Sequence, residues 1–361
     1  MNVLIIDDDE ISVKGIRDYC KDQGWIVKVD GFEESYGDII KFDPDVIVLD
    51  WCEDATGEVS GGNFLKKIWK NGYRPIVIFS GQQDLIDLTE YQRSSLLRSY
   101  PKGDESPVIE YLRDNYTFFD ILSEYRSQVG EALIEAFNVL KPIRDQHEPF
   151  DPSTENDTIK YLLARRTMEY FDLENRNIPL PQWGMYNFPP IANSLTTCDI
   201  IRKSKDIQQD TSAEDYRIIL TPSCDLFISE GREAKVDEVL CAKCFSIDKF
   251  KDKIPGGDSK KGKHHINNAL TTGYYLNLVP LPAMINMCPP MCADMKKLEL
   301  IPLDHIAKND QETDESKEYL RVAGISSPFR EQIVWAYMQS ACRPGVQDRD
   351  FGDWVQEIVG K

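Results

Sequence analysis

The chain has 361 residues, 41% of them hydrophobic, and a formal net charge of -19 at pH 7. This length allows two or three domains, and the apolar fraction is sufficient for hydrophobic cores. No apolar run approaches the roughly 18 residues of a membrane span, and the N-terminus enters a predicted strand instead of a signal peptide. We therefore expect a cytoplasmic protein without membrane contact. The acidic balance disfavours direct DNA binding, because binding phosphates requires clustered cationic side chains.

Predicted strands and helices alternate through the first 125 residues. Apolar, β-branched runs indicate the strands, and apolar residues at helical spacing indicate the helices. This alternation is typical of a doubly wound α/β fold with a parallel sheet. We expect strands near 2–7, 26–30, 45–50, 75–80 and 97–100, and helices near 10–23, 33–41, 62–71 and 84–95.

Polar side chains follow four of these strands. Asp7 and Asp8 end the first, Asp50 the third, Ser80 the fourth, and Lys102 follows the fifth. Carboxyl ends of parallel strands share one edge of a sheet, where such folds bind ligands. Neighbouring carboxylates can hold Mg²⁺, and Asp50 can attack phosphorus as a nucleophile. The lysine can neutralise the transferred group, and the serine hydroxyl can hydrogen bond to it.

This set resembles the receiver domain of two-component response regulators, which is a flavodoxin-like (βα)5 domain. The resemblance covers residues 1–125, with 42 residues from Asp8 to Asp50, 30 from Asp50 to Ser80 and 22 from Ser80 to Lys102. It implies a sensor histidine kinase as phosphoryl donor. The implied roles are Asp7, Asp8, Asp50 and the backbone carbonyl of Cys52 for Mg²⁺, Asp50 as phosphoacceptor, Ser80 as switch hydroxyl and Lys102 as phosphate ligand.

Each of these residues also has a structural interpretation. An aspartate or serine after a strand commonly caps a helix or a turn, and an isolated lysine is usually a solvated charge. Four motifs in order at these distances favour the phosphoryl site. Two departures from the receiver pattern predict an altered switch: Ser99 stands where an aromatic residue is usual, and Gly103 follows the lysine in place of proline.

A long helix is predicted from residue 107 to about 140. Its apolar residues recur at steps of three or four, so they form one stripe that must be buried. Either the helix packs on the second domain, which the shortness of the pattern favours, or it forms a homodimer and carries the signal. A polar linker follows, so the extended helix and linker occupy 107–145. The stripe is Ile109, Leu112, Tyr116, Phe119, Leu122, Tyr125, Val129, Leu133, Phe137 and Leu140.

Residues 158–361 predict an α+β output domain around a small sheet or barrel. We expect strands within 216–221, 236–245, 273–282 and 298–303, and helices near 157–172, 305–323 and 328–342. The segments 219–226 and 322–345 resemble uncharacterised prokaryotic proteins of anti-phage and conflict systems, in which divergent receivers are joined to such domains. That resemblance implies no activity.

One possible catalytic pair lies in the second half. Cys224 is a candidate nucleophile with Asp225 as its orienting acid, and His264, His265 or His305 is a candidate base. The alternative is that Cys224 is a small buried hydrophobic residue and Asp225 caps a turn. This alternative is favoured, because a sequence gives no distance between these groups.

The other cysteines suggest a metal site. Cys241 with Cys244, and Cys288 with Cys292, form two close pairs that suit tetrahedral zinc. However, residues three apart on a strand face opposite sides, and 43 residues separate the pairs. Reduced structural thiols are therefore favoured over zinc.

The segment 248–265 concentrates positive charge. It has six lysines against three aspartates, which suits an acidic partner or a nucleotide phosphate. Mobile, solvated surface is the favoured interpretation of such a loop.

Two functions remain open. The first is a phosphoacceptor response regulator that requires Mg²⁺ and controls an effector protein through its second domain. The second is an effector enzyme, gated by the receiver, that acts on a nucleotide or nucleic acid. The first is favoured, because the second half has no Walker loop and no HExxH or GxSxG motif.

Overall fold

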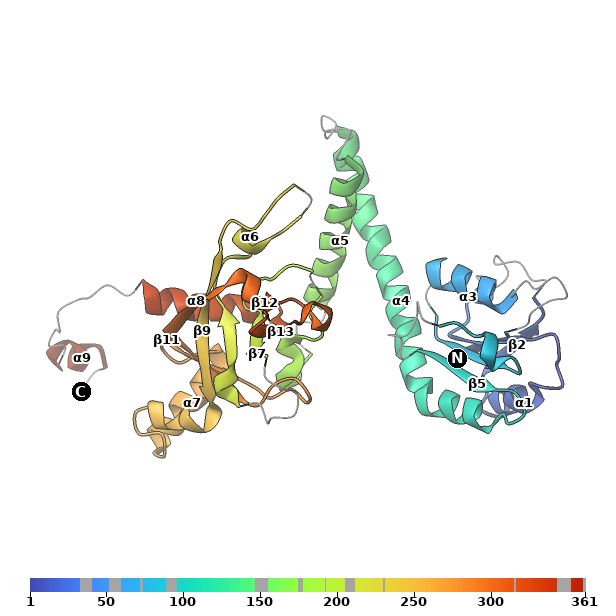
Figure 1. Cartoon of the computed structure of the whole chain (residues 1–361), viewed down its shortest axis with the longest axis horizontal. Helices are drawn as coiled ribbons and strands as arrows, with labels where there is room; N and C mark the ends of the chain where they lie inside the picture. The colour runs from blue at the N-terminus through green and yellow to red at the C-terminus, as the bar shows by residue number, and fades with distance from the viewer. Residues whose placement is uncertain are drawn as a thin grey trace. The chain divides into compact units, whose positions relative to one another are not determined.

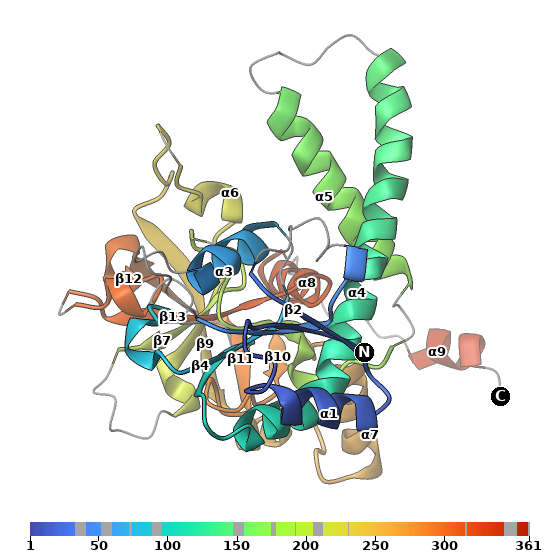
Figure 2. The same cartoon turned by 90° about the vertical axis from the view of Figure 1, so that its right-hand side faces the viewer.

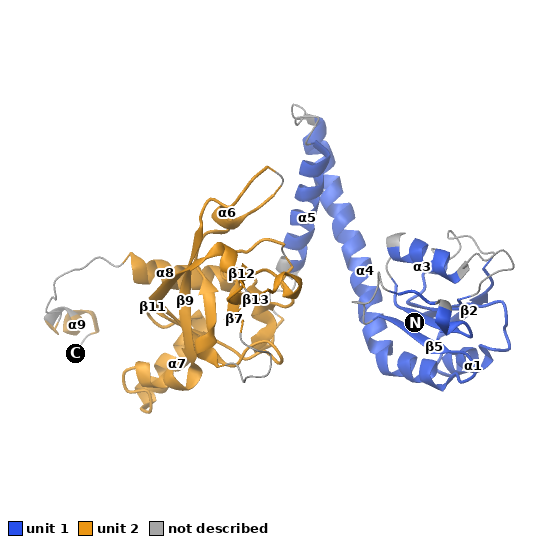
Figure 3. Cartoon of the chain, viewed as in Figure 1, with its two compact units in different colours: residues 1–177 blue, residues 178–361 orange. Residues whose placement is uncertain are grey.

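The computed structural model describes residues 1–32, 41–51, 60–71, 74–88, 96–146, 155–174, 178–191, 193–204, 212–229, 231–314, 316–342 and 352–359. The chain forms two compact units, residues 1–177 and 178–361 (Figure 3). Each unit has its own sheet and its own hydrophobic clusters. We describe the units separately.

Unit 1 is built on a five-stranded parallel sheet with the order β2-β1-β3-β4-β5. Its two outer strands, β2 and β5, are labelled in Figure 1. All five predicted strands are confirmed, and so is the doubly wound arrangement. The apolar runs of the central strands β1, β3 and β4 are buried on both faces, as in parallel sheets covered by helices. The strands are β1 (Asn2–Ile6), β2 (Ile26–Asp30), β3 (Val46–Leu49), β4 (Ile76–Ser80) and β5 (Leu97–Pro101).

Helices cover both faces of this sheet (Figure 2). Helix α1 (Lys14–Asp22) and the first part of α4 pack against one face, and α3 (Ser60–Asn71) packs against the other. The predicted helices at 10–23 and 62–71 are therefore confirmed. Most of the helix predicted at 33–41 lies outside the described residues. In the region predicted as helix 84–95, the described part is a short 3-10 helix, Gln83–Leu85, followed by irregular backbone to residue 88.

The predicted long helix is confirmed as α4 (Ser106–Gln146), which has 41 residues. Its first turns bury Val108, Leu112 and Phe119 in the core of unit 1. Helix α5 (Glu155–Glu174), predicted as part of the second domain, belongs to unit 1 and packs along α4. No helix in the described parts of the chain combines the length and the apolar character that a membrane span requires.

Unit 2 contains an eight-stranded, mainly antiparallel sheet with the path β10-β11-β9-β8-β7-β13-β12, and β6 pairs with β13. Among the described strands of this unit, only β12 and β13 pair in a parallel direction. The strands are β6 (Tyr186–Asn187), β7 (Ile200–Lys203), β8 (Tyr216–Ile219), β9 (Glu238–Ser246), β10 (Leu278–Leu281), β11 (Met291–Pro302), β12 (Ile306–Ala307) and β13 (Tyr319–Ile325). The helices are α6 (Ser223–Leu226), α7 (Lys260–Thr272), α8 (Phe329–Ala341) and α9 (Gly352–Val359).

The four predicted strand segments and the helix at 328–342 are confirmed as β8 to β11 and α8. The helix predicted near 305–323 is wrong. That segment contains β12 and most of β13, whose residues are largely buried between neighbouring strands, so tertiary packing outweighs the local helix preference of its charged residues. Strand β7 was not predicted from the sequence.

The lysine-rich segment 248–265 forms two 3-10 turns and the start of α7, and its six lysines lie exposed at the surface, as expected of solvated surface. Two 3-10 turns lead into α7, where the Ser259 hydroxyl accepts a hydrogen bond from the Gly262 amide at 3.1 Å and caps the helix. Gly273 ends the helix in the left-handed conformation that glycine adopts readily.

Candidate functional site

The polar residues that follow the strands of unit 1 meet at one edge of the sheet. Asp7 follows β1 and Asp50 follows β3, and the backbone amide of Asp50 donates to the Ile6 carbonyl at 2.9 Å, which fixes these two strand ends side by side. The Lys102 amide likewise donates to the Ser80 carbonyl at 3.0 Å, next to the same edge. The strand order therefore brings these four residues together.

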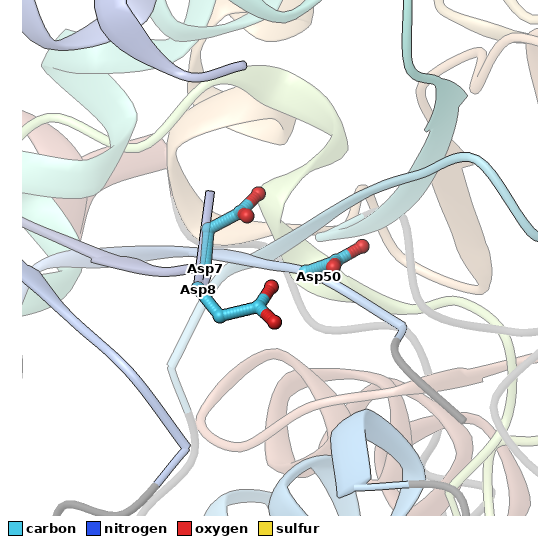
Figure 4. Close-up of side chains that lie close together, drawn as sticks. All are labelled: Asp7, Asp8 and Asp50. Carbon is cyan, nitrogen blue, oxygen red and sulfur yellow. The ribbon is translucent and has the colours of Figure 1, made fainter. Parts of the chain in front are cut away.

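Three carboxylates form the centre of the site (Figure 4). Ligand oxygens of Asp7, Asp8 and Asp50 all lie within 4.8 Å of one another. Asp7 and Asp50 are buried and Asp8 is exposed. Burial raises the pKa of Asp7, although hydrogen bonds from Lys102 and from the Asp9 amide oppose this rise. Carboxylates grouped at this depth repel one another unless a positive charge lies beside them.

The ligand set fits Mg²⁺, because all three side chains offer hard oxygen atoms within reach of one ion. One side of the cluster is open to solvent through Asp8, so a bound ion could keep waters or accept phosphate oxygens there. The fourth expected ligand, the carbonyl of Cys52, lies outside the described residues.

Lys102 supplies a positive charge to the cluster. Its Nζ lies 2.8 Å from Oδ2 of Asp7 and 3.0 Å from Oδ2 of Asp50. Burial alone would lower the pKa of Lys102, but its hydrogen bonds and charge interactions with both aspartates outweigh burial and raise the pKa. The ammonium group therefore stays charged and bridges the ends of β1 and β3.

Backbone contacts hold the remaining parts of the site. Oδ1 of Asp50 accepts a hydrogen bond from the Trp51 amide at 2.8 Å, while Oδ2 faces Lys102. The Ser80 hydroxyl donates to the Trp51 carbonyl at 3.3 Å and accepts from the Gln82 amide at 3.1 Å. A Cβ on Gly61 would lie 2.3 Å from the Asp50 carbonyl oxygen, so only glycine lets α3 start this close.

Gln83 is a site residue that the sequence did not reveal. Its Nε2 donates to the carbonyls of Ser80 at 3.1 Å and Tyr100 at 2.9 Å. Its Oε1 accepts a hydrogen bond from the Ser99 hydroxyl at 2.8 Å. These three bonds, which we call the Gln83 clasp, join the end of β4 to β5. The signal in the sequence was Ser99, which occupies the usual aromatic position.

The candidate catalytic pair of unit 2 is only partly assembled. Sγ of Cys224 lies 3.5 Å from Oδ1 of Asp225, and that acid also pairs with Lys235 at 3.5 Å. Cys224 is exposed, so its interpretation as a buried hydrophobic residue is wrong. Among the contacts of the described residues, none joins Cys224 to a histidine: His264 contacts Asn268, His265 packs against Tyr275, and His305 pairs with Glu318.

The four cysteines of the zinc hypothesis do not form a metal cluster. Among the described residues, Asp7, Asp8 and Asp50 form the only group of three or more potential ligands close enough to share an ion. Cys241 and Cys244 lie on opposite faces of β9, in different hydrophobic clusters. Burial raises the pKa of Cys241 to about 12, and it also raises the pKa of Cys244, Cys288 and Cys292. Buried thiols with raised pKa values favour the protonated form, which does not bind zinc.

Known structures match about a third of the chain. The N-terminal domain of the nisin resistance regulator NsrR, a lantibiotic response regulator, is 21% identical, with 30% of this chain and 92% of that chain covered and a TM-score of 0.26. The BeF3-activated receiver domain of Klebsiella pneumoniae RstA is 18% identical, with 31% and 96% covered and a TM-score of 0.26.

A third similar structure is the N-terminal domain of a response regulator/sensory box/GGDEF protein from Carboxydothermus hydrogenoformans. It is 17% identical, with 35% of this chain and 99% of that chain covered and a TM-score of 0.27. No protein-family model matches the chain. No curated protein matches it either.

Replacing Lys102 tests the charge balance of the acidic cluster. We expect Lys102→Met to bind Mg²⁺ about tenfold more tightly, because the ammonium group no longer competes for two of the three carboxylates. Isothermal titration with MgCl2 measures this. Lys21→Met, on the last turn of α1, is the control and should bind as the unmodified protein does. Unchanged or weaker binding by Lys102→Met would contradict the competition.

Elemental analysis tests the assignment of the cysteines. Protein purified without chelators should contain far less than one zinc per chain, because the four thiols are buried, protonated and not clustered. A stoichiometric amount of zinc that disappears in Cys244→Ser would show that this assignment is wrong.

Proposed function

We propose that this protein is a response regulator whose N-terminal unit accepts a phosphoryl group on Asp50 from a sensor histidine kinase. The observation that carries the proposal is the contact of Lys102 with both Asp7 and Asp50, inside a group of three acids at one edge of a doubly wound sheet. A nucleophilic carboxylate, a cation site and a fixed ammonium group are together what phosphoryl transfer requires.

The reaction forms one bond and breaks one. A carboxyl oxygen of Asp50 attacks the phosphorus of the phosphohistidine donor, the P–O bond forms, and the P–N bond breaks as the imidazole leaves. Lys102 neutralises charge on the phosphoryl oxygens from its position next to Oδ2 of Asp50. Mg²⁺, held by Asp7, Asp8 and Asp50, supplies further positive charge for these oxygens when bound.

The response to phosphorylation begins at Ser80. In the free site its hydroxyl donates to the Trp51 carbonyl. A phosphoryl group on Asp50 is a stronger acceptor, so the hydroxyl turns toward it and shifts the loop after β4. The Gln83 clasp passes this shift to β5, in place of the aromatic side chain that this chain lacks at Ser99.

The output is binding or release of an effector protein by unit 2, in the cytoplasm. The resemblance of its segments 219–226 and 322–345 to proteins of anti-phage and conflict systems supports a defence response as the setting. The alternative, an effector enzyme, gains no support from the described residues, because the Cys224 thiol has no histidine partner among them.

Phosphorylation of Asp50 is tested with a small donor. Incubation with acetyl phosphate and Mg²⁺ should add the mass of one phosphoryl group to the unmodified protein and none to Asp50→Asn. Intact-mass spectrometry measures this. Asp120→Asn, an exposed aspartate on α4, is the matched control and should be modified fully. Full modification of Asp50→Asn, or none of the unmodified protein, would sink the proposal.

The Gln83 clasp is tested by separating phosphorylation from the response. Gln83→Ala should still be modified on Asp50, but residues 97–101 should no longer change their hydrogen exchange when beryllium fluoride and Mg²⁺ are added. Ser99→Ala should behave similarly, because it removes one of the three bonds. Gln23→Ala, at the end of α1, should respond as the unmodified protein does. A normal response of β5 in Gln83→Ala contradicts the role of the clasp.

A further inference from the structure

We propose that Glu105 is a positioning residue, which holds Lys102 at the phosphoryl site by anchoring the loop after β5 to helix α1. This inference deepens the proposed function and rests on it for the role of Lys102. The evidence is the geometry of the loop, the way α1 begins, and the space that Gly15 leaves for the Glu105 side chain.

The loop that carries Lys102 has little support on its C-terminal side. The Lys102 amide donates to the Ser80 carbonyl at 3.0 Å, which fixes the start of the loop. Gly103 follows with a φ of 119°, and a Cβ at this position would have no neighbour within 4 Å. Glycine loses more conformational freedom on folding than any other residue. A further contact is therefore needed to fix the backbone beyond the lysine.

Glu105 makes this contact. Its Oε1 accepts a hydrogen bond at 2.9 Å from the amide of Gly15, which lies 90 residues earlier in the chain. Its backbone carbonyl accepts from the Ile109 amide at 3.0 Å and so begins helix α4. The side chain that binds the first amide of α4 is that of Asp104, whose Oδ1 accepts from Ser106 at 3.0 Å. The backbone of Glu105 thus starts α4 while its carboxylate binds α1.

Helix α1 lacks a capping side chain of its own. Val13 stands at the N-cap position without a side-chain hydrogen bond, and the first turn contains no acidic residue. The first amides of a helix have no partner within the helix, and a negative charge near them is favourable. The Glu105 carboxylate supplies both an acceptor and a negative charge. The contact therefore stabilises the start of α1 as well as the loop after β5.

Gly15 leaves the space that the carboxylate occupies. A Cβ at this position would overlap Oε2 of Glu105 and lie 2.8 Å from its Cδ, and the three nearest atoms that it would meet all belong to Glu105. Alanine in place of Gly15 would therefore displace the carboxylate. Because alanine has a higher helix propensity than glycine, the same substitution does not weaken α1 through its backbone.

The bond between Glu105 and Gly15 matters most once the site is loaded. In the free site, Lys102 is also held by its contacts with Oδ2 of Asp7 and Oδ2 of Asp50. Mg²⁺ and a phosphoryl group would bind these same carboxylates and weaken their hold on the ammonium group. The backbone must then keep Lys102 in place, and the Glu105 carboxylate fixes that backbone to α1.

Rates of phosphorylation by acetyl phosphate test this role. At saturating MgCl2, the maximal rate should fall about tenfold in Glu105→Ala and in Gly15→Ala, because Lys102 is no longer aligned with the phosphoryl oxygens. Mg²⁺ affinity, titrated without donor, should stay within about threefold, because the carboxylates and the competing ammonium group are retained. Glu105→Gln keeps an oxygen acceptor and should restore most of the rate. Glu110→Ala, at an exposed glutamate on α4, is the matched control.

Trace acetylation with acetic anhydride tests the position of the lysine without a phosphoryl donor. In unmodified protein the Lys102 side chain is only 20% exposed. With MgCl2 present, Glu105→Ala and Gly15→Ala should each acetylate Lys102 about fivefold more than the unmodified protein, because the released loop opens more often. Peptide mass spectrometry measures this, with the exposed Lys21 as internal reference.

A normal maximal rate or an unchanged acetylation of Lys102 in both variants would overturn the proposal. Loss of Mg²⁺ binding would overturn it too, because Glu105 would then act on the acids instead of the lysine. Thermal unfolding followed by circular dichroism checks that each variant is folded, and Gly15→Ala provides the test if Glu105→Ala is not. If the unmodified protein accepts no phosphoryl group, the proposed function fails, while the acetylation of Lys102 still decides whether Glu105 positions it.

Discussion

The contact of one ammonium group with two buried carboxylates organises unit 1. Lys102 lies on the loop after β5, at the edge of the sheet, yet its side chain reaches Asp7 after β1 and Asp50 after β3. Without a cation, the oxygens of Asp7, Asp8 and Asp50 would repel one another within 4.8 Å. The lysine therefore stabilises an arrangement of acids that a divalent cation or a phosphoryl group can later use.

The contact of Lys102 with Asp7 and Asp50 requires that the surrounding backbone be held in place, and neighbouring residues do this. Gly61 allows α3 to start against the carbonyl of Asp50, and the Trp51 amide holds the second carboxyl oxygen. Glu105, three residues after Lys102, accepts a hydrogen bond from the Gly15 amide at 2.9 Å, which fixes the loop after β5 to α1. The lysine is thus held from both ends, by its side chain and by the loop that carries it.

The sequence predicted this part well because the information was local. The central strands β1, β3 and β4 are apolar runs rich in β-branched residues, and the polar residue that ends or follows each of them emerges at a known edge of the sheet. Gln83 could not be predicted, because its partners Ser80 and Tyr100 lie on different strands and its role depends on their pairing.

The structure of unit 2 was harder to predict from the sequence, because it too depends on pairing between segments that lie far apart along the chain. Strand β13 is set by its neighbours β7 and β6, both distant in sequence, while its upstream residues favour a helix locally. The cysteine pairs suggested zinc, but the register of β9 and β11 places Cys244 opposite Ala293 and sends Cys241 to the other face. Spacing alone does not show on which face of a sheet a side chain lies when bulges and pairing decide it.

The helix α4 connects the site to the α4–α5 hairpin without a break. It begins four residues after Lys102, buries Leu112 and Phe119 against the sheet, and continues to Gln146 along α5. A flexible linker would not transmit a small displacement of β5. A continuous helix such as α4 can transmit it along its axis. The end of β5 and the α4–α5 hairpin are therefore joined through one continuous element, which packs against the sheet at its start and against α5 further along.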